Sequence, residues 1–293
     1  MPEMPDTWTV LQLINWSTNY LSKKGVENAR LNAERLISHT LKVNRVGLYL
    51  DFDRPLLREE LRNFKRLLLR RASREPLQYI IGETEFYSLP FKVRPGVLIP
   101  RPETEFLVES VLSAVEDQNQ HLHILDAGTG SGIIGVTLAK YLPNTKITAI
   151  DISEDALKVA NENAALNQVE HQVQFVLSAI EDWKSFLPNN ALNFDFIAAN
   201  PPYILPDEKD SLEPEVIEFE PVEALITKAD LSFYRSLFDL AKTHLNPRGK
   251  IYCEIGPSIQ KRVALLLDDL NCKEYHFLKD YAGRSRVVVA SFH

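Results

Sequence analysis

The stretch HILDAGTGSGIIGVTLAKYL, residues 123–142, places a short apolar strand before a glycine-rich turn and an apolar helix. Gly128, Gly130 and Gly132 allow a tight turn, and backbone without side chains can approach a ligand closely. The spacing Gly130-x-Gly132-x-x-Gly135 is also typical of dinucleotide sites, but alone it is weak evidence. The order of strand, loop and helix predicts a ligand at the carboxyl end of a parallel sheet.

Further short apolar runs alternate with helical stretches from about Arg101 onward. This alternation predicts an α/β fold, a doubly wound, Rossmann-like sheet with helices on both faces. Besides residues 123–127, the expected strands are ITAID (147–151), VQFVL (173–177), FDFIAAN (194–200), KIYCEIG (250–256) and RVVVASF (286–292).

Before residue 77 the apolar residues recur at helical steps, as in Leu57, Leu61, Phe64 and Leu68. The other face of this helix is basic, with seven Arg or Lys against three Glu between residues 58 and 76. It is either a solvated face or a docking surface for an RNA-associated partner. We therefore expect a helical domain (1–77), a β-hairpin linker (78–100) and an α/β domain (101–293).

The composition is that of a soluble protein, with 45% hydrophobic and 25% charged residues among 293. No apolar run approaches the roughly 20 residues that span a bilayer, and the opening MPEMPDTWTV has neither a basic region nor an apolar core, so we expect neither membrane insertion nor secretion. We expect a cytoplasmic monomer whose two cysteines, Cys253 and Cys272, are reduced and buried. No metal site is expected, since His121 and His123 lack a third ligand. The net charge of -7 argues against binding nucleic acid by blanket phosphate neutralisation.

Asp151 ends the second strand of the predicted sheet. A carboxylate there can accept hydrogen bonds from both hydroxyls of a ribose. The alternative is an aspartate that helps to cap the helix starting near Ser153. Together with the glycine loop, Asp151 indicates a nucleoside cofactor without saying which one.

The fourth strand ends in Asn200, Pro201, Pro202 and Tyr203, a rigid polar turn. Two prolines cannot donate backbone hydrogen bonds, which leaves the Asn200 side-chain carbonyl and the Pro201 backbone carbonyl as acceptors. Two fixed acceptors suit a planar NH2 group, and Tyr203 can stack on its flat face. The tetrad predicts a substrate that is an amide or an exocyclic amine.

The Asn-Pro-Pro-Tyr tetrad resembles that of amino-methyltransferases that use S-adenosylmethionine. Four further segments resemble the PrmC/HemK family of peptide chain release factor glutamine N5-methyltransferases. They are QYIIGETEFYSLPFKVRPGVLIPRPETEFLVE (78–109), Phe219-Glu220-Pro221, Glu254-Ile255-Gly256 and KDYAGRSRVV (279–288). The resemblance covers nearly the whole chain.

This resemblance implies that S-adenosyl-L-methionine is the cofactor and that class-1 release factors are the protein substrates, recognised by the helical domain. Asn200, Pro201, Pro202 and Tyr203 would hold the glutamine of the Gly-Gly-Gln motif, with Asn200 close to both ligands. In the cofactor site, Asp151 would hold the ribose and Ile180 would lie against the adenine. The residues that would line the rest of that site are Gly128, Thr129, Gly130, Ser131 and Gly132. The chain departs from many members at Ser178-Ala179, where an acid is usual, so Glu181, Asp182 or Trp183 could serve instead.

Other functions remain open. The tetrad also fits an adenine N6-methyltransferase acting on DNA or RNA, whereas the glycine spacing alone fits a nicotinamide-dependent oxidoreductase. A non-catalytic binding module with the same fold is a further alternative. Residues 207–223 carry eight acids and one lysine, which makes either an acidic rim for a basic protein or a solvated loop. Since this rim would repel phosphates, no direct DNA binding is expected.

Overall fold

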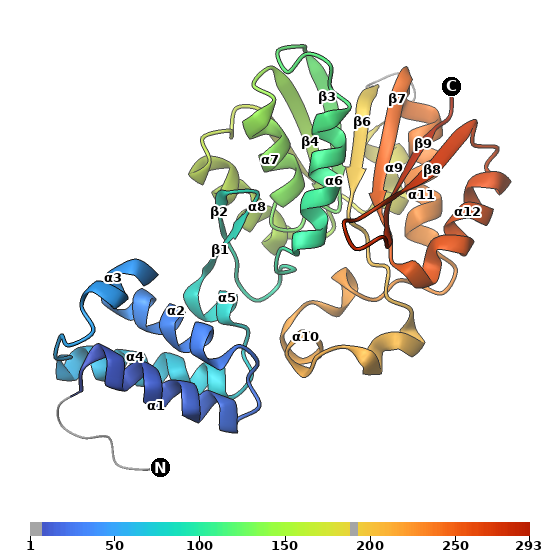
Figure 1. The fold of residues 1–293 in the computed structure, drawn as a ribbon. Coiled ribbons are helices and arrows are strands. Elements are labelled where there is room, and N and C mark those ends of the chain that lie inside the picture. The colour runs from blue at the N-terminus through green and yellow to red at the C-terminus, as the bar shows by residue number, and fades with distance from the viewer. Residues whose placement is uncertain (1–7, 188–192) are drawn as a thin grey trace. The chain divides into compact units, whose positions relative to one another are not determined.

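The computed structural model describes residues 8–187 and 193–293, which fold into two compact units (Figure 1). The helical unit contains the described residues up to Gly82 together with Glu213–Phe219. The sheet unit contains Glu83–Leu212 and Glu220–His293. A segment from the middle of the chain therefore belongs to the helical unit, which the sequence did not suggest.

The helical unit is built around one apolar core. Thr9 caps the first helix reciprocally with Gln12, because each side chain accepts a hydrogen bond from the other residue's backbone N–H. Ile14, Leu36 and Phe64 come from three different helices and are at most 1% exposed. The helices of this unit are α1 (Val10–Lys23), α2 (Ala29–Leu41), α3 (Arg45–Leu50), α4 (Arg58–Ala72), α5 (Leu77–Ile81) and α10 (Pro214–Phe219).

Two expectations for this region are wrong in detail. Leu57 precedes α4 and is 65% exposed, whereas Phe64 and Leu68 are buried as expected. The linker expected over 78–100 begins with helix α5, which ends where Gly82 takes a left-handed conformation. The hairpin is shorter, with β1 at Glu83–Phe86 and β2 at Leu89–Lys92.

The basic face of α4 is not wholly solvated, because Arg71 points inward and is only 5% exposed. Its guanidinium donates to Asn32 Oδ1 at 2.7 Å and to both carboxylate oxygens of Glu215 at 3.0 and 3.1 Å. Arg74 pairs with the same carboxylate at 3.1 Å. Glu215 belongs to the acidic segment, so these ion pairs hold α10 within the helical unit.

The sheet unit contains a seven-stranded sheet of order β5-β4-β3-β6-β7-β9-β8. The strands from β5 to β7 are parallel, while β9 and β8 pair antiparallel, which confirms the expected doubly wound fold. All six expected strands are present, and β8 was missed. The bounds are β3 (Leu122–Ala127), β4 (Thr145–Asp151), β5 (Val173–Leu177), β6 (Phe194–Ala199), β7 (Leu245–Glu254), β8 (Glu274–Lys279) and β9 (Ser285–Ser291).

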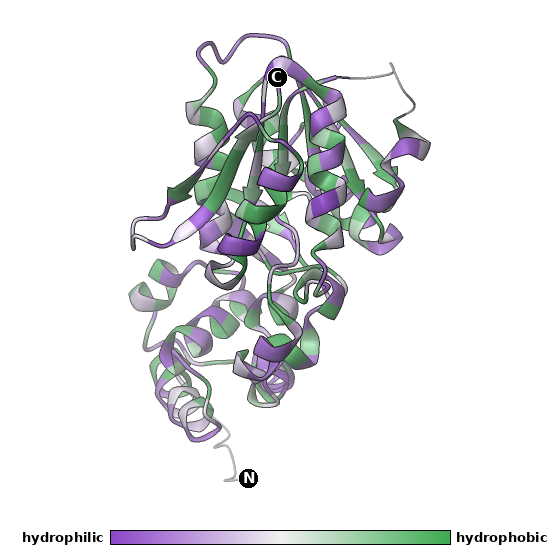
Figure 2. Ribbon diagram, turned by 90° about the vertical axis from the view of Figure 1, so that its right-hand side faces the viewer, coloured by the Kyte–Doolittle hydropathy of each residue, from purple (hydrophilic) through white to green (hydrophobic). Residues whose placement is uncertain are grey.

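Helices cover both faces of this sheet because successive strand residues point to opposite sides. Ile124 packs in a cluster with α6, α7 and α8, whereas its neighbour Leu125 packs with α11 and α12. Figure 2 shows the corresponding hydrophobic colouring of the strands. The helices are α6 (Pro102–Ser113), α7 (Ile133–Tyr141), α8 (Glu154–Leu166), α9 (Trp183–Phe186), α11 (Ser232–His244) and α12 (Gln260–Asp269). Short 3-10 turns span Ile180–Asp182, Pro206–Ser211, Val222–Ala224 and Pro257–Ile259.

Both cysteines carry free thiols, but only Cys253 is buried; Cys272 is partly exposed, contrary to expectation. Within residues 8–187 and 193–293, none of the helices is long and apolar enough to cross a membrane.

The ion pairs of Glu215 lead to a first prediction. Glu215→Ala leaves the buried Arg71 without its counter-charge, and breaking a buried pair in this way is strongly destabilising. We expect amide hydrogen exchange over residues 213–219 to accelerate by about 10-fold to 100-fold, equivalent to about 1.4 to 2.8 kcal/mol of local stability. The matched control is Glu218→Ala, since Glu218 is exposed in the same helix. Equal exchange in the two variants would contradict the role given to Glu215.

Candidate active site

Four parallel strands bring polar residues to one edge of the sheet. Asp126 and Asp151 lie at the carboxyl ends of β3 and β4, and Asn200 and Glu254 occupy the corresponding ends of β6 and β7. Because these strands are adjacent and parallel, their carboxyl ends meet at the same edge. This edge is where ligands bind in open α/β sheets.

The glycine loop turns back onto the neighbouring strand. The backbone N–H groups of Gly128 and Thr129 both donate to the carbonyl of Ile150 at 2.9 Å. Gly128, Gly130 and Gly132 have φ values of 74°, 56° and 85°, a left-handed conformation that favours glycine. A Cβ at Gly130 would meet no heavy atom within 4 Å, so this part of the loop is open to a ligand.

Asp126 is a fully buried carboxylate beneath this loop. Its Oδ2 accepts from the Thr129 hydroxyl at 2.5 Å and from the Gly135 N–H at 2.8 Å, while Oδ1 has no hydrogen-bond partner among the described residues. Burial raises the pKa of Asp126 to about 6. A Cβ at Gly135 would lie 2.9 Å from Oδ2, so the third glycine of the spacing is required by this contact.

Asp151 is fixed by backbone on both sides. Its Oδ2 accepts from the Gly130 N–H at 2.8 Å and its Oδ1 from the Ser153 N–H at 2.9 Å. Burial raises the pKa of Asp151. Ser153 itself caps α8, so Asp151 is free to present its remaining lone pairs to a ligand.

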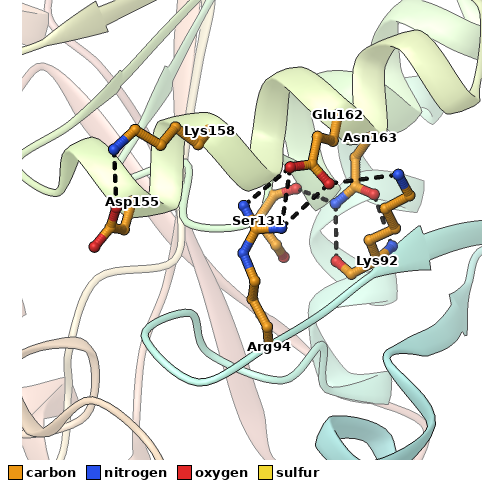
Figure 3. A network of polar contacts seen from close by, with 7 residues as sticks. All are labelled: Lys92, Arg94, Ser131, Asp155, Lys158, Glu162 and Asn163. Carbon is orange, nitrogen blue, oxygen red and sulfur yellow. Dashed lines mark hydrogen bonds and ion pairs between the residues drawn. The ribbon is translucent and has the colours of Figure 1, made fainter.

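Asn163 on α8 joins the loop to the hairpin, as Figure 3 shows. Its side-chain NH2 donates to the carbonyls of Ser131 at 2.8 Å and Lys92 at 3.0 Å, and its Oδ1 accepts from the Lys92 N–H at 2.7 Å. Glu162 beside it pairs with Arg94 at 3.0 Å. The sequence analysis missed Asn163, although a polar residue on the apolar face of a helix was a signal.

Asn200 is oriented by its neighbours. Its Nδ2 donates to Thr104 Oγ1 at 3.0 Å, and the Thr104 hydroxyl donates to Glu254 Oε2 at 2.8 Å. This hydrogen bond uses the NH2 side of the amide, so Asn200 Oδ1 is turned away from Thr104. The sequence analysis assigned Thr104 and Glu254 no role in the site, although both lie in segments that resemble the family, and both are fully buried.

Tyr203 packs its ring on the backbone after β7. A Cβ at Gly256 would lie 2.9 Å from Tyr203 Cδ2, so glycine is required there. Burial raises the pKa of the Tyr203 phenol above its usual range. Burial also raises the pKa of Glu254 to about 7, although Thr104 and Arg286 act in the opposite direction.

Ile180 follows β5 near Asp151, because the Ser178 N–H donates to the Asp151 carbonyl at 3.0 Å. Its side chain is 3% exposed and packs in the same core cluster as Trp183. Glu181 is one of the residues that could serve in place of the acid missing at Ala179. Its Oε1 lies 3.5 Å from Lys228 Nζ.

Two family profiles match this chain. The profile of the PrmC N-terminal domain matches residues 12–82, and that of a methyltransferase domain matches residues 118–263.

Several proteins of known name are similar over nearly the whole chain. The release factor glutamine methyltransferase of Geobacter sulfurreducens is 43% identical over 289 residues, covering 98% of each chain. The protein of the same name from Rhodopirellula baltica is 37% identical over 287 residues, covering 96% of this chain and 95% of the relative.

Solved structures share the fold at low sequence identity. The N-terminal domain of human METTL16 in complex with SAH covers 94% of each chain, with a TM-score of 0.53 and 14% identity. A T. thermophilus 16S rRNA methyltransferase, RsmC, in complex with AdoMet and guanosine gives a TM-score of 0.52 and 16% identity. It covers 72% of this chain and 50% of its own.

The buried Asp126 leads to a prediction about pH and stability. Its folded pKa is about 6 against an ordinary 3.8, so its contribution to stability is present below pH 4 and lost as the pH rises through 6. Asp126→Asn keeps an acceptor for Thr129 and Gly135 but removes the charge. We expect the ligand-free variant to be more stable than wild type by at most about 3 kcal/mol at pH 7.5, and by only about 1 kcal/mol at pH 4.5. Chemical denaturation at both pH values measures this, and a variant less stable at pH 7.5 would contradict it.

Proposed function

Because this chain belongs to the release factor glutamine methyltransferase family, we propose that its sheet edge holds S-adenosylmethionine at the glycine loop and the substrate glutamine at Asn200–Tyr203. The protein transfers a methyl group from S-adenosylmethionine to the side-chain amide nitrogen of a release factor glutamine. The observation that carries the assignment of the site is the hydrogen bond from Asn200 Nδ2 to Thr104, which leaves Oδ1 to accept from a substrate NH2.

The residues at the loop fit the cofactor. Asp126 Oδ1 is a buried, unpaired carboxylate oxygen, which suits the cationic amino group of a methionine moiety. Asp151 has spare lone pairs for ribose hydroxyls, and the open space at Gly130 admits a ligand against the backbone. Ile180 supplies an apolar side chain for the adenine side of the site.

The sulfonium of the bound cofactor supplies an activated methyl group, so the protein's main task is to position a poor nucleophile. Asn200 Oδ1 and the Pro201 carbonyl accept the two hydrogens of the substrate NH2 and aim its nitrogen. Pro201 and Pro202 keep this turn stiff, and Tyr203 stacks on the amide plane. Orientation of this kind reaches effective molarities of about 10^5 M or more.

The helical unit is the proposed recognition domain for the release factor, and the glutamine modified is that of the Gly-Gly-Gln motif. The exposed basic residues of α4, among them Arg62, Lys65 and Arg66, offer a surface for an acidic patch of that partner. The protein acts as a cytoplasmic monomer, without direct DNA binding. No feature of the site favours the adenine-methylation alternative over glutamine.

Mass spectrometry of a release factor tests this function directly. After incubation with the protein and S-adenosylmethionine, we expect one added methyl group, about 14 Da, on the Gly-Gly-Gln glutamine, because a methyl replaces one amide hydrogen. Labelled methyl appearing in DNA or RNA, with none on the factor, would instead support the adenine alternative.

Asn200→Ala removes the proposed acceptor without removing the glycine loop. We expect the methylation rate to fall about 100-fold or more, because a fixed polar partner of the reacting group is lost, while cofactor affinity falls at most about 3-fold. Asn119→Ala, at an exposed loop position, is the matched control and should keep the wild-type rate. Single-turnover kinetics and calorimetric titration measure the two quantities. A normal methylation rate in Asn200→Ala would rule out the proposal that Asn200 Oδ1 holds the substrate NH2 group.

A further inference from the structure

A chain of hydrogen bonds runs from the proposed substrate site into the core of the sheet unit. Asn200 Nδ2 donates to Thr104 Oγ1 at 3.0 Å, and Thr104 Oγ1 donates to Glu254 Oε2 at 2.8 Å. Thr104 lies in the first turn of α6, and Glu254 ends β7. Thr104 and Glu254 are both 0% exposed, so water does not compete for these bonds.

The direction of this chain depends on what each group can donate. An ionised carboxylate is only an acceptor, so the single hydroxyl proton of Thr104 must point to Glu254. Thr104 Oγ1 can then only accept from Asn200, which requires the NH2 side of the Asn200 amide. The carbonyl side of that amide is consequently turned away from Thr104.

The burial of Glu254 is costly, and the hydrogen bond from Thr104 satisfies only its Oε2. Oε1 has no hydrogen-bond partner among the described residues. The Tyr203 phenol lies near enough to lower the pKa of this carboxyl but does not meet the geometry of a hydrogen bond to Oε1. An unpaired oxygen on a buried carboxylate that interacts with Tyr203 and is linked through Thr104 to Asn200 indicates a functional rather than a stabilising role for the group.

The charged groups around Glu254 have opposing effects. Arg286 on β9 favours its ionised form, whereas Glu103 on α6 disfavours it. Arg286 is shared with two other acids, Asp280 at 3.0 Å and Glu103 at 3.6 Å. From α11, the Tyr234 hydroxyl donates to the backbone carbonyl of Glu254 at 3.1 Å.

We propose that Glu254, acting through the Thr104 hydroxyl, is a positioning residue that keeps Asn200 Oδ1 directed toward the substrate amide. This inference rests on the proposed function and adds two residues to it. When Glu254 is protonated, its own proton can be donated to Thr104, whose hydroxyl is then free to donate to Asn200 Oδ1. The Asn200 amide would reverse and present its NH2 group to the substrate NH2 group. Since both groups are donors, no hydrogen bond would then hold the substrate amide.

The Thr104 hydroxyl can be removed with little change in shape. Thr104→Val should lower kcat for release factor methylation about 10-fold to 100-fold, with KM and cofactor affinity changed less than about 3-fold, because only the orientation of Asn200 is lost. Thr104→Ser restores the hydroxyl and should return kcat to within about 3-fold of wild type. Thr137→Val is the matched control, since the buried Thr137 hydroxyl has no hydrogen-bond partner among the described residues.

The pH profile tests Glu254 separately. With a pKa of about 7, wild-type kcat should rise as the pH increases and be about 10-fold lower at pH 6 than on its alkaline plateau. Glu254→Gln should be slower at pH 8.5 and should lose this dependence, because a neutral amide does not titrate. Thermal midpoints show whether each variant is folded.

These outcomes separate the inference from the proposed function. If wild type methylates no release factor, the proposed function fails first. If wild type is active, a wild-type kcat in Thr104→Val, a Thr104→Ser as slow as Thr104→Val, or an acid limb retained in Glu254→Gln each overturns the inference alone. An effect confined to KM would also overturn it, since it would indicate a binding contact.

Discussion

Three carboxylates at the ends of parallel strands, two of them fully buried, constrain the rest of the sheet unit. Asp126, Asp151 and Glu254 lose most of their hydration, and a buried polar group is costly unless hydrogen bonds replace water. Asp151 has backbone donors on both oxygens, whereas Asp126 and Glu254 each keep one oxygen unpaired. Asp126 is hydrogen-bonded to the glycine loop through Thr129, and Glu254 is linked to Asn200 through Thr104.

Close packing at this edge of the sheet also requires glycine at particular positions. Gly135 lets α7 approach Asp126, and Gly256 lets the backbone after β7 approach Tyr203, because a Cβ at either position would lie 2.9 Å from its neighbour. Gly132 similarly admits α8, where a Cβ would be 3.1 Å from that of Ala160. Two of the three glycines in the spacing shared with nicotinamide sites, Gly132 and Gly135, are thus required by close packing of strand and helices, which explains why the spacing alone does not define a cofactor.

Contiguous signals in the sequence were sufficient for the fold and for the two motifs from which the site is proposed. Apolar runs predicted six strands, but β8 was missed because only alternate residues of EYHFLK are even partly buried at its start. Tyr79–Ile81 resembled a strand in composition, yet Gly82 and tertiary packing favour the helix α5. The glycine loop and the tetrad are local motifs, whereas Thr104 and Glu254 are 150 residues apart and meet only in the folded sheet.

The need to fix the orientation of the Asn200 side-chain amide explains why the Glu254 carboxylate is buried despite the free-energy cost of its desolvation. The oxygen and NH2 of Asn200 are nearly the same size, so packing alone cannot distinguish the two orientations of the amide. Only hydrogen bonds of fixed polarity can do so, and a carboxylate is the one side chain that accepts without donating. Because Glu254 accepts from the Thr104 hydroxyl, Thr104 accepts from the Asn200 NH2 group. In our proposal, Asn200 Oδ1 then accepts from the substrate. In the proposed site the acceptors that orient the neutral nucleophile are themselves uncharged, so they do not compete with the substrate for the cationic sulfonium from which the methyl group comes.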